Sequence, residues 1–248
     1  MLILFALFLA SIWAGAQNAL AGGGSFITLP ALILTGMDAR AANITSTVAL
    51  FPAQIIMGST GRNLAAGLPG LSLKALFAIS LAGGAIGGVI LLATPPSFFA
   101  LLVPWLVLFA TAIFAWGSFF RRPLAPGRAM LPPWAAGIGQ FLIAIYGGYF
   151  GGGIGFLMMA ALAMAGQSVR TAGATKNILA GVMNASAVAI FVFSPDVYWL
   201  QALITAVGGS LGGWGGALTL QRVNENYLRF GVVIVGILLT IGLFLRAP

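Results

Sequence analysis

The hydrophobic positions of this chain form ten long runs, separated by short stretches rich in polar residues, glycine or proline. Within the runs, apolar and polar residues do not alternate, which favours helices over β-strands. We therefore predict ten helical segments. They span residues 2–21, 25–36, 41–58, 72–93, 99–119, 132–149, 154–166, 171–193, 199–219 and 227–246.

The composition indicates that lipid surrounds these helices. Hydrophobic residues make up 60% of the 248-residue chain and charged residues only 6%, whereas a soluble domain carries roughly 25% charged residues. The first segment lacks the basic start and cleavage site of a signal peptide, so we interpret it as a retained membrane segment. We predict an all-α polytopic membrane protein of the lipid bilayer, with no nucleic-acid partner.

The two halves of the chain resemble each other, which indicates an internal duplication. Four residues of the first half recur 130 positions later, as Gly36, Arg40, Ala42 and Thr45 match Gly166, Arg170, Ala172 and Thr175. The runs GGAIGG at 83–88 and GGSLGG at 208–213 follow in the same order. We expect a first transmembrane repeat at 1–120, a cytoplasmic linker at 121–133 and a second repeat at 134–248.

Because each half holds five segments, an odd number, the second repeat should insert upside down relative to the first. Basic residues of membrane proteins concentrate in cytoplasmic loops. With both termini outside, the outer side receives only Arg40 and Arg246, and the cytoplasmic side receives Arg62, Lys74, Arg121, Arg122, Arg128, Arg170, Arg222 and Arg229. The sequence therefore favours two inverted five-segment repeats.

The second segment of each half, 25–36 or 154–166, is too short to cross the membrane. At 1.5 Å per residue it covers under about 20 Å, less than the roughly 30 Å hydrocarbon core. Each follows three glycines, Gly22–Gly24 or Gly151–Gly153. We expect each first pair of segments to form a broken or re-entrant hairpin whose turn lines a cavity. Ser25 is expected to cap the first short helix.

Polar residues follow one face of the third segment in each half. At 100° per residue they lie within about 40° of one line. Polar groups avoid lipid, so both stripes should face the protein interior, either lining a cavity or forming helix–helix hydrogen bonds. The stripes comprise Arg40, Asn43, Thr47, Gln54 and Gly58 in the first half, and Arg170, Gly173, Asn177, Gly181 and Asn184 in the second.

Lys176 lies within the second of these segments, and the sequence offers no carboxylate as an obvious partner. A buried ammonium is costly unless water or an anion reaches it, although lysine can also extend its head group towards the interface. Backbone N–H groups at the amino ends of the short helices would add anion donors. We expect Thr45 and Thr175 either to cap the broken helices or to line the site, with helix packing as the alternative.

Cysteine and histidine are absent from the sequence, so we expect no cofactor and no metal, because the usual haem, zinc and iron–sulfur sites need them. Common intramembrane hydrolases need histidine, and no serine is spaced to pair with Lys176, so we do not expect an enzyme. The acids Asp38, Asp196 and Glu225 fall near segment ends. A proton-coupling carboxylate in mid-membrane is not evident.

The glycine turns together with GMDARAANITST at 36–47 and GQSVRTAGATKN at 166–177 resemble the sulfite exporter TauE/SafE family, also called the toluene sulfonate uptake permease family. The resemblance covers nearly the whole chain. It implies a prokaryotic plasma-membrane permease for sulfur-containing anions such as sulfite, thiosulfate or organosulfonates. The substrate-binding residues that it implies are Gly22, Gly23, Gly24, Ser25, Asn43, Thr45, Ser46, Gly151, Gly152, Gly153, Thr175, Lys176 and Asn177.

The sequence thus predicts a transporter that works by alternating access at one mid-membrane site shared by two repeats. Ser46 stands where the second half has Lys176, so the site would be electrostatically asymmetric. The alternatives are an anion-selective channel and a non-transporting assembly subunit. A homodimer is left open.

Overall fold

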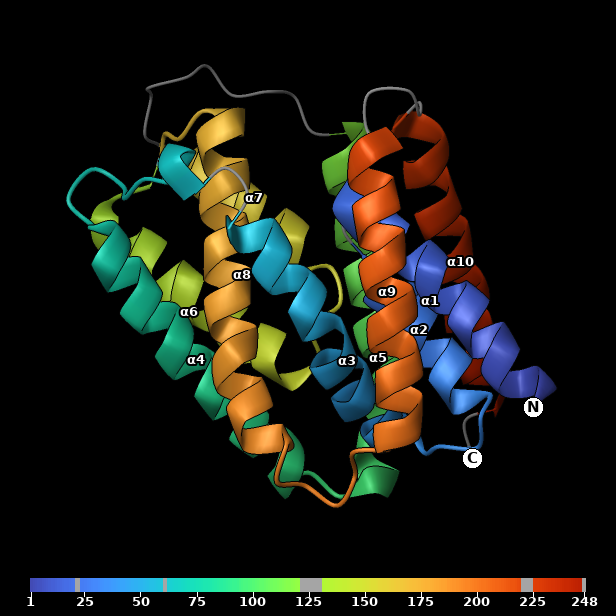
Figure 1. Ribbon diagram of the computed structural model, residues 1–248. Coiled ribbons are helices and arrows are strands. Elements are labelled where there is room, and N and C mark those ends of the chain that lie inside the picture. Colours follow the sequence, from blue (N-terminus) through green and yellow to red (C-terminus); the bar gives the residue numbers. More distant parts are fainter. Residues whose placement is uncertain (21–22, 60–61, 121–130, 220–224, 247–248) are drawn as a thin grey trace.

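The computed structural model describes residues 1–20, 23–59, 62–120, 131–219 and 225–246. Within these ranges all ten predicted segments are α-helices (Figure 1). A single turn at Arg62–Leu64 precedes α4, and Trp116–Phe120 extends α5. The helices are α1 Leu2–Leu20, α2 Ser25–Ile33, α3 Ala39–Ser59, α4 Leu73–Ala93, α5 Pro96–Ala115, α6 Pro133–Tyr149, α7 Ile154–Met164, α8 Val169–Phe191, α9 Trp199–Thr219 and α10 Glu225–Arg246.

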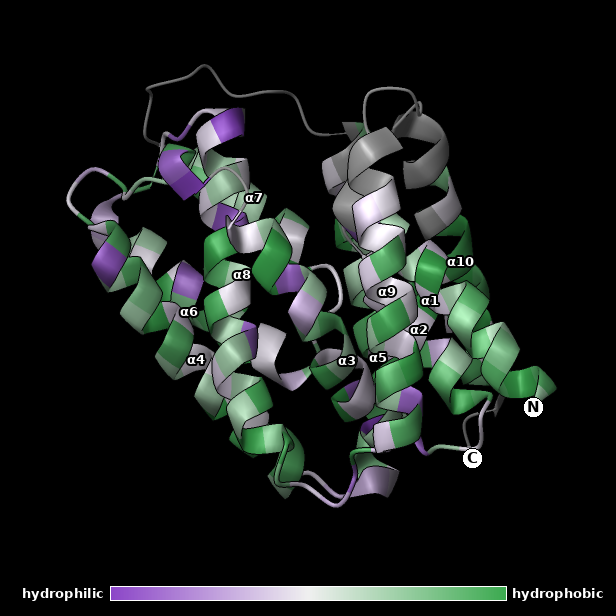
Figure 2. Ribbon diagram, in the orientation of Figure 1, coloured by the Kyte–Doolittle hydropathy of each residue, from purple (hydrophilic) through white to green (hydrophobic). Residues whose placement is uncertain are grey.

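The outer surface of the helices is apolar. Hydrophilic residues gather at the two ends of the bundle and on α3 and α8 in its middle (Figure 2). Large side chains such as Trp105, Trp134 and Leu203 are more than half exposed, at 61%, 70% and 61%, which suits contact with lipid. By length and composition, the described helices able to cross a membrane are Ala39–Ser59, Leu73–Ala93, Pro96–Ala115 and Arg170–Phe191.

Helices at equivalent positions of the two halves, such as α1 and α6, make equivalent pairs. α1 packs on α9 as α6 packs on α4, and α3 packs on α9 as α8 packs on α4. Helices α3 and α8 contact each other, and so do α5 and α10. The fourth helix of each half, α4 or α9, therefore packs against the first and third helices of the other half. α1 starts at the end of the bundle where the N and C marks lie, and α6 starts at the opposite end (Figure 1).

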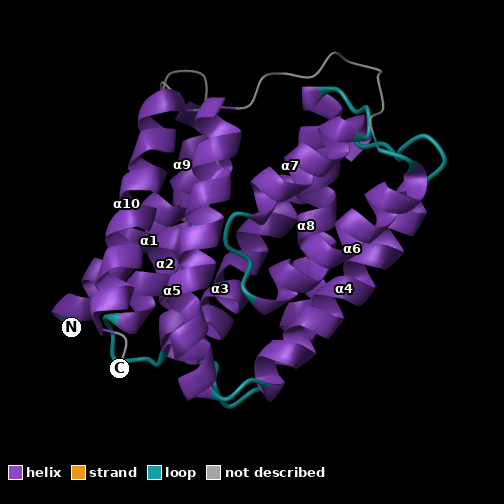
Figure 3. Ribbon diagram, turned by 180° about the vertical axis from the view of Figure 1, so that it is seen from behind, coloured by secondary structure: helices purple, strands orange, loops and turns teal. Residues whose placement is uncertain are grey.

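The short helices α2 and α7 begin inside the bundle. The connection between α6 and α7 lies midway between the two ends (Figure 3). Gly23 and Gly153, 130 residues apart, have φ angles of 84° and 72°, in the left-handed region that glycine adopts without strain. With 9 and 11 residues, α2 and α7 extend only about 14 and 17 Å. Both are therefore short of the hydrocarbon thickness, as the sequence predicts.

The expected capping of α2 by Ser25 is wrong. The N-cap is Gly24, which makes no side-chain cap hydrogen bond, and Ser25 is already the first helical residue. Gly24 itself has helical angles, φ −55° and ψ −30°, so Ser25 lies one position too far along to bind the N–H groups of the first turn. The predicted turn residue Gly22 lies outside the described residues.

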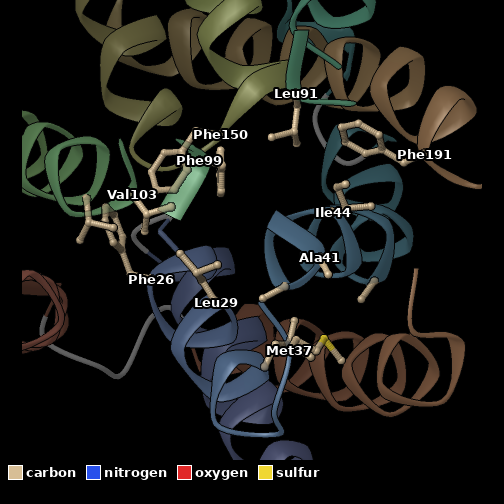
Figure 4. Packing of buried hydrophobic residues seen from close by; sticks show 14 of the residues in the cluster. Phe26, Leu29, Met37, Ala41, Ile44, Leu91, Phe99, Val103, Phe150 and Phe191 are labelled. Atoms are coloured by element: carbon tan, nitrogen blue, oxygen red, sulfur yellow. The ribbon is translucent and has the colours of Figure 1, made fainter. Parts of the chain in front are cut away.

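Buried hydrophobic side chains hold the two short helices in place. Phe26 and Leu29 of α2 pack in one cluster with Phe99 and Val103 of α5 (Figure 4). The α7 residues Ile154, Met158 and Leu162 belong to a second cluster, which also includes Leu179 and Met183 of α8. This packing fixes the depth at which both helix breaks lie.

Glycines allow the backbones of paired helices to meet. A Cβ atom added at Gly212 of α9 would collide with the carbonyl oxygen of Ile12 in α1, and one added at Gly148 of α6 would collide with the carbonyl of Gly84 in α4. Small residues at such crossings let membrane helices approach closely. By contrast, a Cβ at Gly139, also in α6, would meet no atom within 4 Å.

We expect Gly148→Ala to destabilise the protein by about 1–3 kcal/mol, because the added methyl must push two backbones apart. Gly139→Ala is the matched control on the same helix and should be neutral or slightly stabilising. Thermal unfolding of the purified protein in detergent measures both. Equal melting temperatures for the two variants would contradict the close packing of α4 on α6.

Candidate functional site

A cavity lies where the two helix breaks meet α3 and α8. It offers about 80 Å³ to the centres of water-sized molecules. Because one water needs roughly 10–15 Å³ on this measure, the cavity holds several waters or one small anion. The lining residues are Asn18, Gly23, Ser25, Ser46, Thr47, Leu50, Gln54, Met57, Phe150, Gly151, Gly153, Ile154, Gly155, Phe156, Lys176, Asn177, Ala180 and Asn184.

The cavity lining draws on equivalent positions of the two halves. Six pairs of lining residues are separated by 130 positions: Gly23 and Gly153, Ser25 and Gly155, Ser46 and Lys176, Thr47 and Asn177, Leu50 and Ala180, and Gln54 and Asn184. The last pair is joined directly, because Asn184 Nδ2 donates a 2.6 Å hydrogen bond to Gln54 Oε1. The cavity is therefore a single site to which both halves contribute.

Lys176 brings a positive charge to the cavity without a carboxylate partner. Its side chain reaches the first turn of α7, since a Cβ added at Gly155 would lie 3.7 Å from its Nζ. Among the described residues, the one ion pair joins Arg40 to Asp196 and does not involve Lys176. A cation in this position favours the approach of an anion.

The start of α7 adds backbone donors to the same place. The N–H groups of Phe156 and Leu157 donate to the carbonyl of Gly153, at 3.1 and 3.4 Å. The N–H groups of Ile154 and Gly155 have no acceptor in the described part of the chain, although both residues line the cavity. Free N–H groups at a helix start bind anions, so they complement the ammonium group of Lys176.

Seven of the predicted site residues line the cavity, and these are Gly23, Ser25, Ser46, Gly151, Gly153, Lys176 and Asn177. Gly24 and Gly152 are buried within the two turns but are not among the lining residues. Asn43 also lies outside the lining, where its Nδ2 donates a 3.1 Å hydrogen bond to the carbonyl of Tyr149 at the end of α6.

Thr45 and Thr175 do not cap the broken helices and do not line the cavity. Thr45 Oγ1 donates to the carbonyl of Asp196 at 3.3 Å and accepts from the N–H of Tyr198 at 3.2 Å. Thr175 Oγ1 donates to the carbonyl of Ala66 at 3.3 Å and accepts from the N–H of Ala66 at 3.1 Å. Each threonine therefore holds the chain that follows the other third-segment helix, where backbone groups need partners.

Of these two contacts, Arg40 strengthens only the one that Thr45 makes with the segment around Asp196. Its Nη2 lies 2.7 Å from Asp196 Oδ2, and its Nη1 donates to the carbonyl of Thr94 at 2.8 Å. The equivalent Arg170 is exposed, and Ala66 stands where the other half has Asp196. The sequence stripe placed Arg40 with the cavity-facing residues, but its guanidinium is engaged at the end of the bundle instead.

Four polar lining residues lie outside the predicted site. Thr47, Gln54 and Asn184 belong to the polar stripes, so their spacing carried a usable signal. Asn18 lies near the end of α1, and its Oδ1 is 3.5 Å from the N atom of Gly24. Its only sequence signal is an amide in an apolar segment, four residues before the first glycine of the turn.

The fold and the cavity together define a multi-pass helical membrane protein with an internal polar site, the class to which transporters belong. The chain belongs to the sulfite exporter TauE/SafE family, whose model matches residues 7–243. This confirms the resemblance carried by its motifs, and the protein is a multi-pass bacterial membrane protein of a transporter family.

Three curated relatives cover nearly the same length. The chain is 28% identical to the probable membrane transporter protein ORF9 of a Sinorhizobium species, over 96% of this chain and 90% of that protein. It is 25% identical to a probable membrane transporter protein of Haemophilus influenzae, over 96% and 93%. It is also 25% identical to the probable membrane transporter protein YfcA of Escherichia coli K12, over 94% and 87%.

We expect Arg40→Gln to lower the free energy of unfolding by about 1–3 kcal/mol, because it removes charge-assisted hydrogen bonds that are partly shielded from water. Arg170→Gln, at the equivalent exposed position, should change it by less than about 0.5 kcal/mol. Denaturant or thermal unfolding of the two purified variants compares them. An equal loss in both would contradict the asymmetry between the two ends.

Proposed function

We propose that this protein transports small sulfur-containing anions through one site at the centre of two inverted repeats, 1–120 and 134–248, joined by a cytoplasmic linker at 121–133. The observation that carries the proposal is the cavity, where equivalent residues of both halves surround a lysine that pairs with no carboxylate in the described part of the chain. The preserved helix pairing and the opposite starting ends of α1 and α6 support the inverted arrangement. The family's name supports sulfite and its chemical relatives as substrates.

The polar groups of the cavity suit an oxyanion. Lys176 attracts the charge, and the hydroxyls of Ser25 and Ser46 and the amide of Asn177 can donate to its oxygens. The N–H groups at the start of α7 supply further donors. Among the described residues no aspartate or glutamate lines the cavity, so no carboxylate of this part of the chain repels a negative substrate there. A group with three oxygens can accept several of these hydrogen bonds at once.

Alternating access is the transport mode that we propose. The contacts of Thr45 and Thr175 close the bundle at opposite ends of α3 and α8, and opening one while keeping the other would expose the cavity to one side at a time. Arg40 reinforces only the end held by Thr45, so that end should open less readily. An anion-selective channel is the alternative, and it requires both ends to open together.

Counterflow in proteoliposomes tests transport and the role of Lys176. We expect unlabelled sulfite trapped inside to accelerate the uptake of labelled sulfite. Lys176→Gln should weaken apparent affinity about 10- to 100-fold, since one charge-assisted contact contributes about 1.5–3 kcal/mol. Lys74→Gln, an exposed lysine at the start of α4, is the matched control and should transport normally.

Each outcome of the counterflow assay has a defined meaning. Flux without acceleration by trapped substrate would replace the carrier with a channel. Normal transport by Lys176→Gln would remove this residue from the site. A complete lack of flux for sulfite, thiosulfate and sulfonates would overturn the proposed function.

The chain lacks cysteine, so a single introduced thiol reports on access to the cavity. We expect Ala180→Cys to react faster with a membrane-impermeant maleimide from the side of Arg40 when Arg40→Gln is also present, because the closing contact at that end is weakened. Reaction from the opposite side should slow in the same variant. Unchanged labelling from both sides would contradict a gating role for the contact between Arg40 and Asp196.

A further inference from the structure

The charge of the cavity points to the ionic form that it accepts. We propose that the transported species is a singly charged anion, such as hydrogen sulfite or a sulfonate, and that doubly charged anions are excluded. This inference rests on the proposed function and adds to it a rule of selection by charge that holds across chemically different sulfur oxyanions.

The lining residues carry one whole charge. Lys176 is the only lysine, arginine, aspartate or glutamate among them. At the equivalent position the first half has Ser46, whose Oγ lies 2.6 Å from Thr28 Oγ1. The duplication therefore provides two matching places for a cation, and only one of them is charged.

The helix ends at the cavity add little net charge. The positive start of α7 follows the negative end of α6 within a few residues, so the two dipole ends largely offset each other. Protein donors also occupy carbonyl groups at this turn, because Asn43 Nδ2 binds the carbonyl of Tyr149 and the hydroxyl of Tyr146 binds that of Gly152. The ammonium of Lys176 is left as the dominant charge.

The other described charged residues on α8 and on the elements that pack against it do not add to the charge of the cavity. Arg62, Lys74 and Arg170 are exposed, outside the cavity lining. Arg40, on α3, is paired with Asp196. Water screens the exposed charges much more strongly than it screens Lys176.

Charge balance then decides which anion fits. A singly charged anion beside Lys176 gives a neutral occupied site, which can be shielded from water at low cost. A doubly charged anion leaves one uncompensated negative charge at membrane depth, which is strongly unfavourable. The neutral hydroxyl and amide donors can orient the oxygens but cannot supply the missing charge.

The experiment uses the purified full-length protein in proteoliposomes and varies pH across the second ionisation of sulfite, which falls near neutrality. We expect the exchange of labelled sulfite to fall in proportion to the hydrogen sulfite fraction as pH rises. Exchange of methanesulfonate, singly charged throughout, should stay constant and so controls for effects of pH on the protein. Sulfate and thiosulfate, doubly charged, should compete at least about 10-fold more weakly than methanesulfonate.

A charge placed at the equivalent position provides a second test. Ser46→Lys should let sulfate and thiosulfate compete at least about 10-fold better than in the wild type, because the cavity then carries two cations. Ser46→Met, of similar length and uncharged, is the matched control and should not. If Ser46→Lys fails to fold, the pH profile of the wild type still decides the question.

The outcomes separate this inference from the proposed function. If sulfite exchange rises with pH, or if thiosulfate competes as well as methanesulfonate, the selection of single charge is wrong while sulfur-anion transport stands. If none of these anions exchanges, both the proposed function and the inference are overturned.

Discussion

The structure depends on the interruption of two helices at the centre of the bundle. A broken helix inside a membrane leaves backbone groups that lipid cannot satisfy, so protein groups or a hydrated cavity must do so. Here Asn43 and Tyr146 satisfy carbonyls around the second break, and Asn18 approaches the backbone of the first. The N–H groups of Ile154 and Gly155 remain at the cavity. The same interruption that costs hydrogen bonds therefore leaves backbone donors at a polar cavity, where we propose that an anion binds.

The matching helix pairs of the two halves explain why the cavity is central, and the sequence differences between the halves explain its polarity. Equivalent residues meet there because the two third-segment helices, α3 and α8, contact each other. The two halves differ in charge at two pairs of equivalent positions. Lys176 faces the cavity where the other half has Ser46, and Asp196 pairs with Arg40 where the other half has Ala66. We propose that the first difference selects the ligand, and the second distinguishes the two ends of the bundle.

The sequence predicts the local features well because they depend on local chemistry. Runs of apolar residues define the helices, and glycine triplets mark the breaks. The 130-residue repeat and the lone Lys176 indicate much of the cavity. The partners of Thr45, Thr175 and Arg40 could not be predicted, because they belong to segments more than 100 residues away, as with Arg40 and Asp196, which are separated by 156 positions. The N-cap of α2 was mispredicted because a helical Gly24 shifts the helix start by one residue.

An experimental structure with selenite, a heavier analogue of sulfite, would test the central claim most directly. Selenium gives an anomalous signal that locates the anion without ambiguity. The account predicts one strong peak in the cavity, within hydrogen-bonding range of Lys176 Nζ through the selenite oxygens and beside the turns at Gly23 and Gly153. A peak elsewhere in the protein, or an empty cavity at a selenite concentration that saturates exchange, would contradict it.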